Sequence, residues 1–202
     1  MKKLFLSFLT LSVFNLMAQP AKKGKEMKMT PLFSPGYYVN LKGDTVRGEI
    51  QTNLEKETDL YISFFYRPKG TPKGTEITTK KAKAYGYDDI HFSTIKIDEQ
   101  TDVYIKYLEM GRLILLEYKF LKTEEGVVKN HSIFFIKDTR AASDDKLGTG
   151  ELNQLPERNH KKALKPFFHD QPILLEQVDK WYFKIDEIRK AVMEFNKMYA
   201  ES

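Results

Sequence analysis

The side chains able to do acid–base or metal chemistry are few and scattered in this chain. It has four histidines and no cysteine, which excludes a disulfide framework, a thiolate metal site and a cysteine nucleophile. His91 follows Asp88 and Asp89, a grouping that could offer oxygen and nitrogen ligands to a metal ion. Acidic turns beside a histidine are common, so we expect a solvated turn there and no metal or cofactor.

His131 is the histidine best placed for general-base chemistry, because it lies in an alternating segment with Lys129 and Ile133 on its side. A general base needs an orienting carboxylate and a nucleophile within reach, and the sequence places neither. Glu109 and Glu117 could form a glycosidase pair, which uses two carboxylates several ångströms apart. No nucleophile elbow, phosphate-binding loop or paired-histidine motif is present. We therefore predict a protein that is not an enzyme, with an envelope polysaccharide or peptide hydrolase as the least favoured alternative.

Tyrosines are the other candidates, because tyrosine joins an apolar ring to a polar tip and suits binding faces. They concentrate in the predicted strands, where half-solvated tyrosines are also common for structural reasons. A possible binding face for a glycan or peptide comprises Tyr37, Tyr38, Tyr61, Tyr104, Tyr118 and His131.

The first residues have the order of a secretory signal peptide. Lys2 and Lys3 precede an apolar run over residues 4–17, and the small residue Ala18 precedes Gln19. The run is too short and too polar to span a bilayer comfortably. We expect residues 1–18 to be a cleaved signal peptide, residues 19–34 a flexible linker, and residues 35–202 one β-rich domain with helices over about 161–200. The protein is then exported, either to the periplasm or to the outer membrane or cell exterior, with no integral membrane segment after cleavage.

The charge balance argues against a nucleic-acid partner. The formal net charge of +5 falls to +3 when Lys2 and Lys3 leave with the signal. The remaining lysines are interspersed with carboxylates, whereas nucleic-acid binding needs a focused basic face.

The segments after the linker predict an antiparallel meander. Residues 37–41 and 46–50 alternate around a Gly43-Asp44 turn, which is typical of a β-hairpin. Residues 60–66 read as a strand buried on both sides, and residues 70–81 as an exposed loop. Short turns join the strands that follow, so these should be antiparallel neighbours. Their predicted bounds are 83–87, 91–97, 103–108, 112–121 and 127–137.

The C-terminal part predicts helices. Residues 138–160 lose periodicity and indicate a long loop. Pro166 can begin a short turn, and Asp170 can cap a helix whose first turn contains Pro172. Apolar residues then recur every three or four positions, and the aromatic cluster over residues 181–183 favours a break into two helices. We predict an α+β fold in which a curved antiparallel sheet or partial barrel is covered by C-terminal helices.

Two stretches resemble a group of mostly uncharacterised exported proteins of the Bacteroidota. The first is residues 36–50, with a Gly-Tyr strand, a Gly-Asp-Thr turn and a Gly-x-Ile strand. The second comprises residues 167–174 and the helix end at residues 195–199. The resemblance implies compartment and domain type and transfers no catalytic residue.

Together these observations predict a non-catalytic cell-envelope protein that binds another envelope protein, a glycan or a peptide. The alternative is a structural or assembly factor of the outer membrane, in which the C-terminal helix pairs with a partner. Exposure of Trp181 and Phe195 would favour that alternative. The sequence indicates neither the ligand nor the oligomeric state.

Overall fold

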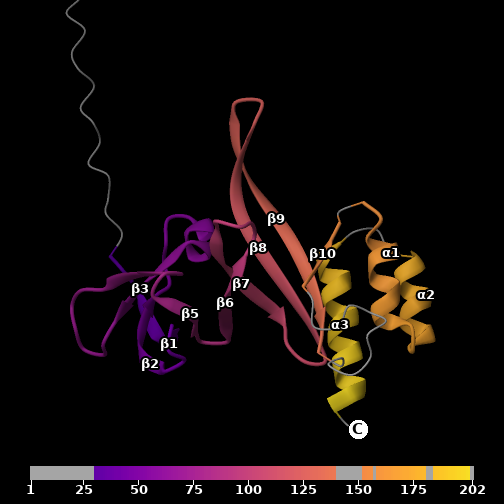
Figure 1. Cartoon of the computed structure of the whole chain (residues 1–202), viewed down its shortest axis with the longest axis horizontal. Helices are drawn as coiled ribbons and strands as arrows, with labels where there is room; N and C mark the ends of the chain where they lie inside the picture. Colours follow the sequence, from indigo (N-terminus) through magenta and orange to yellow (C-terminus); the bar gives the residue numbers. More distant parts are fainter. Residues whose placement is uncertain (1–29, 140–151, 157, 181–183, 201–202) are drawn as a thin grey trace, which may run out of the picture. The chain divides into compact units, whose positions relative to one another are not determined.

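The computed structural model describes residues 30–139, 152–156, 158–180 and 184–200. It shows an α+β fold in which an antiparallel sheet precedes a group of helices (Figure 1). The strands are β1 (Phe33–Asn40), β2 (Thr45–Gln51), β3 (Ser63–Arg67), β4 (Thr75–Thr78), β5 (Ala82–Tyr87), β6 (Ile90–Lys96), β7 (Asp102–Glu109), β8 (Leu113–Glu124), β9 (Val127–Asp138) and β10 (Asn153–Leu155). The helical elements are η1 (Glu57–Tyr61), α1 (His160–Leu164), η2 (Lys165–Phe168), α2 (Pro172–Lys180) and α3 (Ile185–Ala200). The predicted fold class is therefore confirmed.

Within the described residues, the ten strands form one open sheet in the order β10-β9-β8-β7-β6-β5-β1-β2-β3-β4. Every pairing is antiparallel. Strands β5 to β9 follow one another as the predicted meander. The β1–β2 hairpin is also confirmed, with Gly43 at φ +98° in its turn, a conformation that glycine adopts without steric cost. β1 begins at Phe33, slightly before the domain start expected at residue 35.

Three predictions about local structure are wrong. Residues 60 and 61 belong to the 3₁₀ helix η1, and the strand begins only at Ser63; the side chains of Ile62 and Phe65 are exposed rather than buried. The loop expected over residues 70–81 contains β4, which pairs with β3. The loop expected over residues 138–160 contains β10, which pairs with β9. In the last two cases a tertiary pairing, absent from the local pattern, decides the outcome.

Two predictions about helices are confirmed. A short helical turn begins near Pro166, and the last helical stretch is divided into α2 and α3. Pro172 is the first residue of α2, where its missing N–H costs nothing. The aromatic residues 181–183, like the expected signal peptide, lie outside the described residues.

Two hydrophobic clusters stabilise the part of the chain from Pro31 onward, which forms one compact unit. The first packs α1, η2, α2 and α3 against β8, β9 and β10, with Leu115, Ile136 and Phe195 fully buried. The second is aromatic and joins η1 and β3 to β1 and β5–β7. In it the ring of Tyr85 stacks between Phe64 and Phe92, with centroid distances of 4.1 and 4.5 Å.

Candidate binding site

Two of the six predicted binding residues belong to the core. Tyr61 and Tyr104 are fully buried; they pack in the aromatic cluster and cannot contribute to an accessible face. The Tyr104 hydroxyl donates a hydrogen bond of 3.3 Å to the Ala82 carbonyl. Burial raises the pKa of the Tyr104 phenol, because the interior disfavours the phenolate. The prediction that these two tyrosines belong to a binding face is therefore wrong. Alternation along the sequence does not indicate which side of a strand is covered.

Tyr37 and Tyr38 point to opposite sides of β1. Tyr38 packs edge-on against Tyr66 at a centroid distance of 4.9 Å, on the side of the aromatic cluster. Tyr37 lies on the other side, where its hydroxyl oxygen is 3.0 Å from Nδ1 of His91. The histidine that follows Asp88 and Asp89 is thus within hydrogen-bond distance of a tyrosine.

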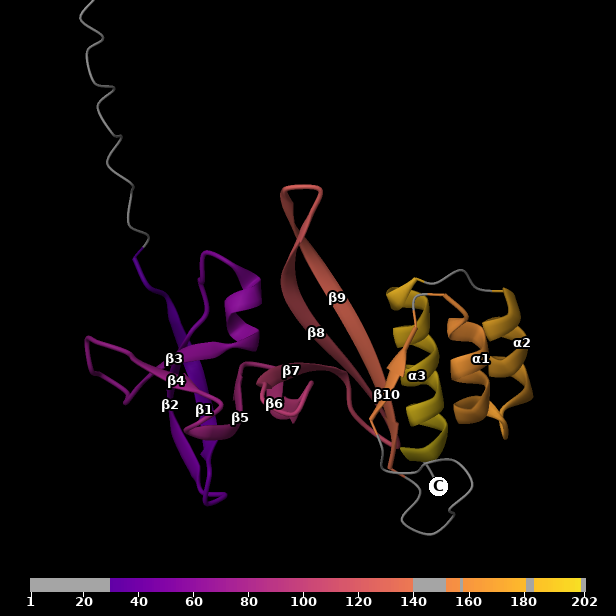
Figure 2. The same cartoon turned by 45° about the horizontal axis from the view of Figure 1, so that its top comes forward.

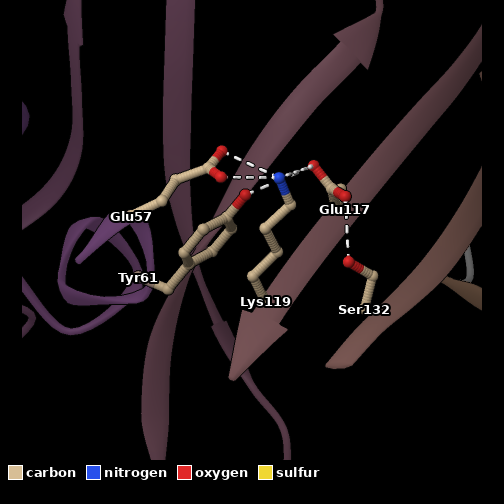
Figure 3. A network of polar contacts seen from close by, with 5 residues as sticks. All are labelled: Glu57, Tyr61, Glu117, Lys119 and Ser132. Carbon is tan, nitrogen blue, oxygen red and sulfur yellow. Dashed lines mark hydrogen bonds and ion pairs between the residues drawn. The ribbon is translucent and has the colours of Figure 1, made fainter. Parts of the chain in front are cut away.

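Tyr61 forms part of a polar network centred on the buried carboxylate of Glu117 (Figure 3). The Tyr61 hydroxyl donates to Oε2 of Glu117 at 3.3 Å, and Ser132 donates to Oε1 at 3.1 Å. The Lys119 ammonium lies 3.7 Å from Glu117 and 2.8 Å from Glu57. The network therefore joins η1, β8 and β9, with one ammonium bridging two carboxylates.

The electrostatics of this network keep Tyr61 protonated. Burial and the neighbouring carboxylates of Glu117 and Glu57 all raise the pKa of the Tyr61 phenol. A buried carboxylate is tolerated when it is hydrogen-bonded and paired, as Glu117 is. The network thus has a clear structural role in attaching η1 to β8.

The two carboxylates considered as a glycosidase pair have separate partners. Glu109 forms an ion pair of 2.6 Å with Arg189 of α3, whereas Glu117 is held by Tyr61, Ser132 and Lys119. Phe195, whose exposure would have favoured helix pairing with a partner, is fully buried, and Trp181 lies outside the described residues.

Tyr118 and His131 come together through a residue that the sequence reasoning missed. The Phe120 ring stacks on Tyr118 at 5.5 Å and lies 5.7 Å from the His131 ring. Phe120 pairs with His131 and Tyr118 with Ile133 in the β8–β9 register, so one face of the hairpin carries all four. The alternation of residues 118, 120, 122 and 124 could have revealed this row.

The same face carries a charged cluster nearer the turn. The Glu124 carboxylate lies 2.9 Å from the ammonium of Lys122, 3.5 Å from that of Lys129 and 3.4 Å from Nε2 of His131. The hydrogen bond from Lys122, followed by the nearby positive charges, lowers the pKa of the Glu124 carboxyl. The cluster therefore holds more basic than acidic groups.

Beyond its pairing with β7 and β10, the β8–β9 hairpin continues as a two-stranded ribbon. Pairing with β7 involves residues 115–117 of β8, and pairing with β10 involves residues 134–136 of β9. Residues 118–133 are therefore paired only with each other within the described chain (Figure 2). Val127 and Val128 near the turn are 57% and 61% exposed, and Leu121 is also exposed. Apolar side chains are thus presented to solvent on a ribbon whose two edges have no further strand among the residues that the structure describes.

A groove of about 420 Å³ follows one side of this ribbon. It is lined by residues 130–134 of β9, by Phe120, and by Gln154 and Leu155 of β10. The groove therefore runs along the outer edge of β9 from the point where β10 ends. His131 is the only one of the six predicted residues among the residues that line it.

Among the described residues, no group of three or more histidine or acidic side chains is arranged to hold a metal ion. None of the helices in the described ranges is both long and apolar enough to cross a membrane. No protein-family model, no curated protein and no solved structure matches the chain.

Proposed function

We propose that this chain is an exported, non-catalytic protein of the cell envelope. It binds another protein through the two-stranded ribbon of the β8–β9 hairpin, residues 118–133. Export is supported by the signal-peptide pattern of residues 1–18 and by the resemblance of residues 36–50 to exported proteins of the Bacteroidota. On this proposal the mature protein resides in the periplasm, at the outer membrane or outside the cell.

One observation carries the binding proposal: exposed valines and a leucine lie on a ribbon whose edges are not paired with any other strand of the described chain. Exposed edge strands favour association with other chains, and proteins usually protect them with short length, bulges, proline or charge. Here the ribbon is long and carries Leu121, Val127 and Val128 in solvent. A polypeptide partner can satisfy both the apolar side chains and the backbone groups, whereas a glycan satisfies mainly the aromatic and polar ones.

The test is site-specific photo-crosslinking in the native host. A photoreactive residue at Val128 should capture one discrete envelope protein. The same residue at the exposed Lys190 of α3, the matched control, should not. The double variant Val127→Ser, Val128→Ser should abolish capture by a crosslinker at Leu121. The mature N-terminus should be Gln19.

Two results would contradict the proposal. If the chain retains Met1 and is found in the cytoplasm, the proposed export is wrong. If Val128 and Lys190 capture the same proteins equally, or if only glycan is captured, the hairpin is not a protein-binding element.

A further inference from the structure

The outer edge of β9 exposes a defined series of backbone groups. Glu125 and Gly126 form a two-residue turn with φ of +52° and +78°, and Glu124 pairs with Val127 across it. In such a hairpin the closing pair is hydrogen-bonded, and hydrogen-bonded pairs then alternate with non-hydrogen-bonded ones. Val128, Asn130 and Ser132 belong to the second kind, so their N–H and C=O groups point away from β8.

An independent contact supports this assignment. Leu113 pairs with Asp138 in the same phase of the ladder, so its backbone groups should also point out of the hairpin, on the β7 side. The Leu113 N–H indeed donates to the side chain of Asn196, and the Leu113 carbonyl accepts from it, both at 2.8 Å. The alternation is thus fixed at the base of the hairpin.

The pairing of β10 covers only part of this edge. β10 covers the edge from Ile136 to Phe134, where Leu155 is its last paired residue. The next helix, α1, begins at His160. Val128, Asn130 and Ser132 therefore remain without a strand partner in the described part of the chain, and the groove lies beside the last two.

We infer that this edge takes up an extended segment of the partner protein, which adds to the sheet as a further strand in line with β10. Outward donor and acceptor groups recur every second residue, about 6.8 Å apart, a spacing that another extended main chain matches. This inference rests on the proposed function and specifies its partner. Strand addition obtains affinity from the backbone and specificity from alternate side chains.

The side chains beside the edge define the partner segment further. One face offers Phe120, His131 and Ile133, with Lys122 and Lys129 nearer the turn. The other face offers Asn130 and Ser132. An alternating segment with apolar residues on the first face and polar residues on the second fits both. Because Glu124 is the single carboxylate among Lys122, Lys129 and His131, an acidic residue beside Lys129 completes the charge balance.

Charge also argues against a second copy of this chain as the occupant. Antiparallel pairing of two β9 edges would bring the Lys129 ammonium groups of the two copies onto one ribbon. Like charges on neighbouring strands destabilise the pairing. A heterologous acidic segment avoids this cost.

Amide hydrogen exchange followed by NMR tests the inference without any substitution. The probe is a capped synthetic peptide of roughly eight residues, with alternating valine and threonine and one glutamate replacing a valine. Its addition to the full mature protein should slow exchange of the Val128, Asn130 and Ser132 amides. The outward amides of Lys119, Leu121 and Thr123, on the opposite edge of the same ribbon, should exchange as before.

A matched pair of proline variants gives the second readout. Asn130→Pro removes one outward N–H of the β9 edge and should weaken peptide binding roughly tenfold or more. Leu121→Pro removes the outward N–H of its cross-strand partner on the β8 edge and should leave binding within about twofold. Asn130→Ala, which keeps the N–H, separates backbone pairing from the loss of the amide side chain.

The outcomes distinguish this inference from the proposed function. Protection of Lys119, Leu121 and Thr123 instead, or equal effects of both prolines, overturns strand addition at β9. Protection that depends on protein concentration without peptide identifies a second copy and overturns the heterologous partner. Unchanged exchange with peptide, alongside specific crosslinking from Val128 in the host, overturns the strand mode while the binding function stands.

Discussion

At the scale of single residues, the Glu117 network shows how a buried charge becomes a structural attachment. Its carboxylate accepts hydrogen bonds from Tyr61 and Ser132 and lies near the Lys119 ammonium. Each donor comes from a different element, so the carboxylate specifies where η1 lies on β8. Loss of a donor leaves a buried acceptor partly unsatisfied, which costs more than the hydrogen bond itself contributes.

The substitution Tyr61→Phe tests this role. It keeps the aromatic packing and removes one donor to Glu117, so the free energy of unfolding should fall by about 1–3 kcal/mol. The matched control is Tyr118→Phe, at a ring whose centroid lies 5.9 Å from that of Tyr61; it should change stability by less than about 0.5 kcal/mol. Urea unfolding followed by circular dichroism measures both. If both variants lost the same free energy of unfolding, the Tyr61 hydroxyl would have no particular role in stability.

Alkaline pH should destabilise the fold through its buried tyrosines. Burial raises the pKa of Tyr61, Tyr85 and Tyr104 above the ordinary value of 10.0. Below pH 10 the phenols are neutral in both states, and their contribution to stability is complete. As pH rises above 10 the unfolded chain loses these protons first, so stability falls progressively.

Thermal unfolding between neutral pH and strongly alkaline pH, followed together with tyrosinate absorbance, measures this effect. The melting temperature should begin to fall near the ordinary tyrosine pKa, and the absorbance of the buried phenols should appear only on unfolding. A constant melting temperature through that range would contradict the assignment.

The sequence predicts that tyrosines concentrate in the strands, but it does not indicate which of them are accessible and which are buried. Tyr61 and Tyr104 were expected in strands with accessible faces, but Tyr61 lies in η1 and both are enclosed by aromatic neighbours. Which side of a strand is covered depends on distant elements. Tyr118 and His131, by contrast, share a face by simple alternation, and only the intervening Phe120 was missed.

At the scale of elements, Asn196 connects α3 to the start of β8. Its side-chain amide both accepts from and donates to the backbone of Leu113, as a neighbouring strand would. Gly111 makes room for it, because a Cβ there would lie 2.5 Å from Cγ of Asn196. The turn before β8 and the helix thus constrain each other.

A double-mutant cycle measures that constraint. Asn196→Ala should cost about 1–3 kcal/mol, because it leaves two partly buried backbone groups without a partner. Gly111→Ala alone should displace the asparagine and cost a similar amount. The double variant should be more stable than additivity predicts, by about 1 kcal/mol. Additive losses would show that the two residues act separately.

The elements that the sequence predicted well have local causes. The β1–β2 hairpin has its glycine turn, and the β8–β9 hairpin has Glu125 and Gly126 at positive φ. By contrast, β4 and β10 are short strands whose place in the sheet comes from pairing with β3 and β9. Their own residues therefore carry little signal. The same holds for the candidate site. The sequence predicts the two strands of the ribbon, but it does not predict which part of the β9 edge is uncovered, because it does not predict β10.

At the scale of the whole chain, two cores share one sheet. The helical cluster includes residues of β8 and β9, and the aromatic cluster includes residues of β5–β7. The two are connected through the β7–β8 pairing, through η1 on β8 and through the Glu117 network. We expect these connections to make unfolding cooperative across both clusters.

Substitutions in each core test this expectation. Phe195→Ala in the helical cluster and Phe64→Ala in the aromatic cluster should each cost about 3–5 kcal/mol. Each should lower the midpoint of one common transition, in which calorimetric and van't Hoff enthalpies agree. A second transition in either variant would show that the clusters unfold independently.

The place where β10 ends has a consequence for the length of any strand that joins β9. An edge strand can be occupied by the molecule's own chain or by a foreign one, and the two compete for the same backbone groups. Because β10 pairs with β9 only as far as Phe134, a foreign strand that pairs with Ser132, Asn130 and Val128 does not have to displace β10. In the proposed binding mode, the stretch of β9 between Phe134 and the Glu125–Gly126 turn therefore sets an upper limit on the number of partner residues that can pair.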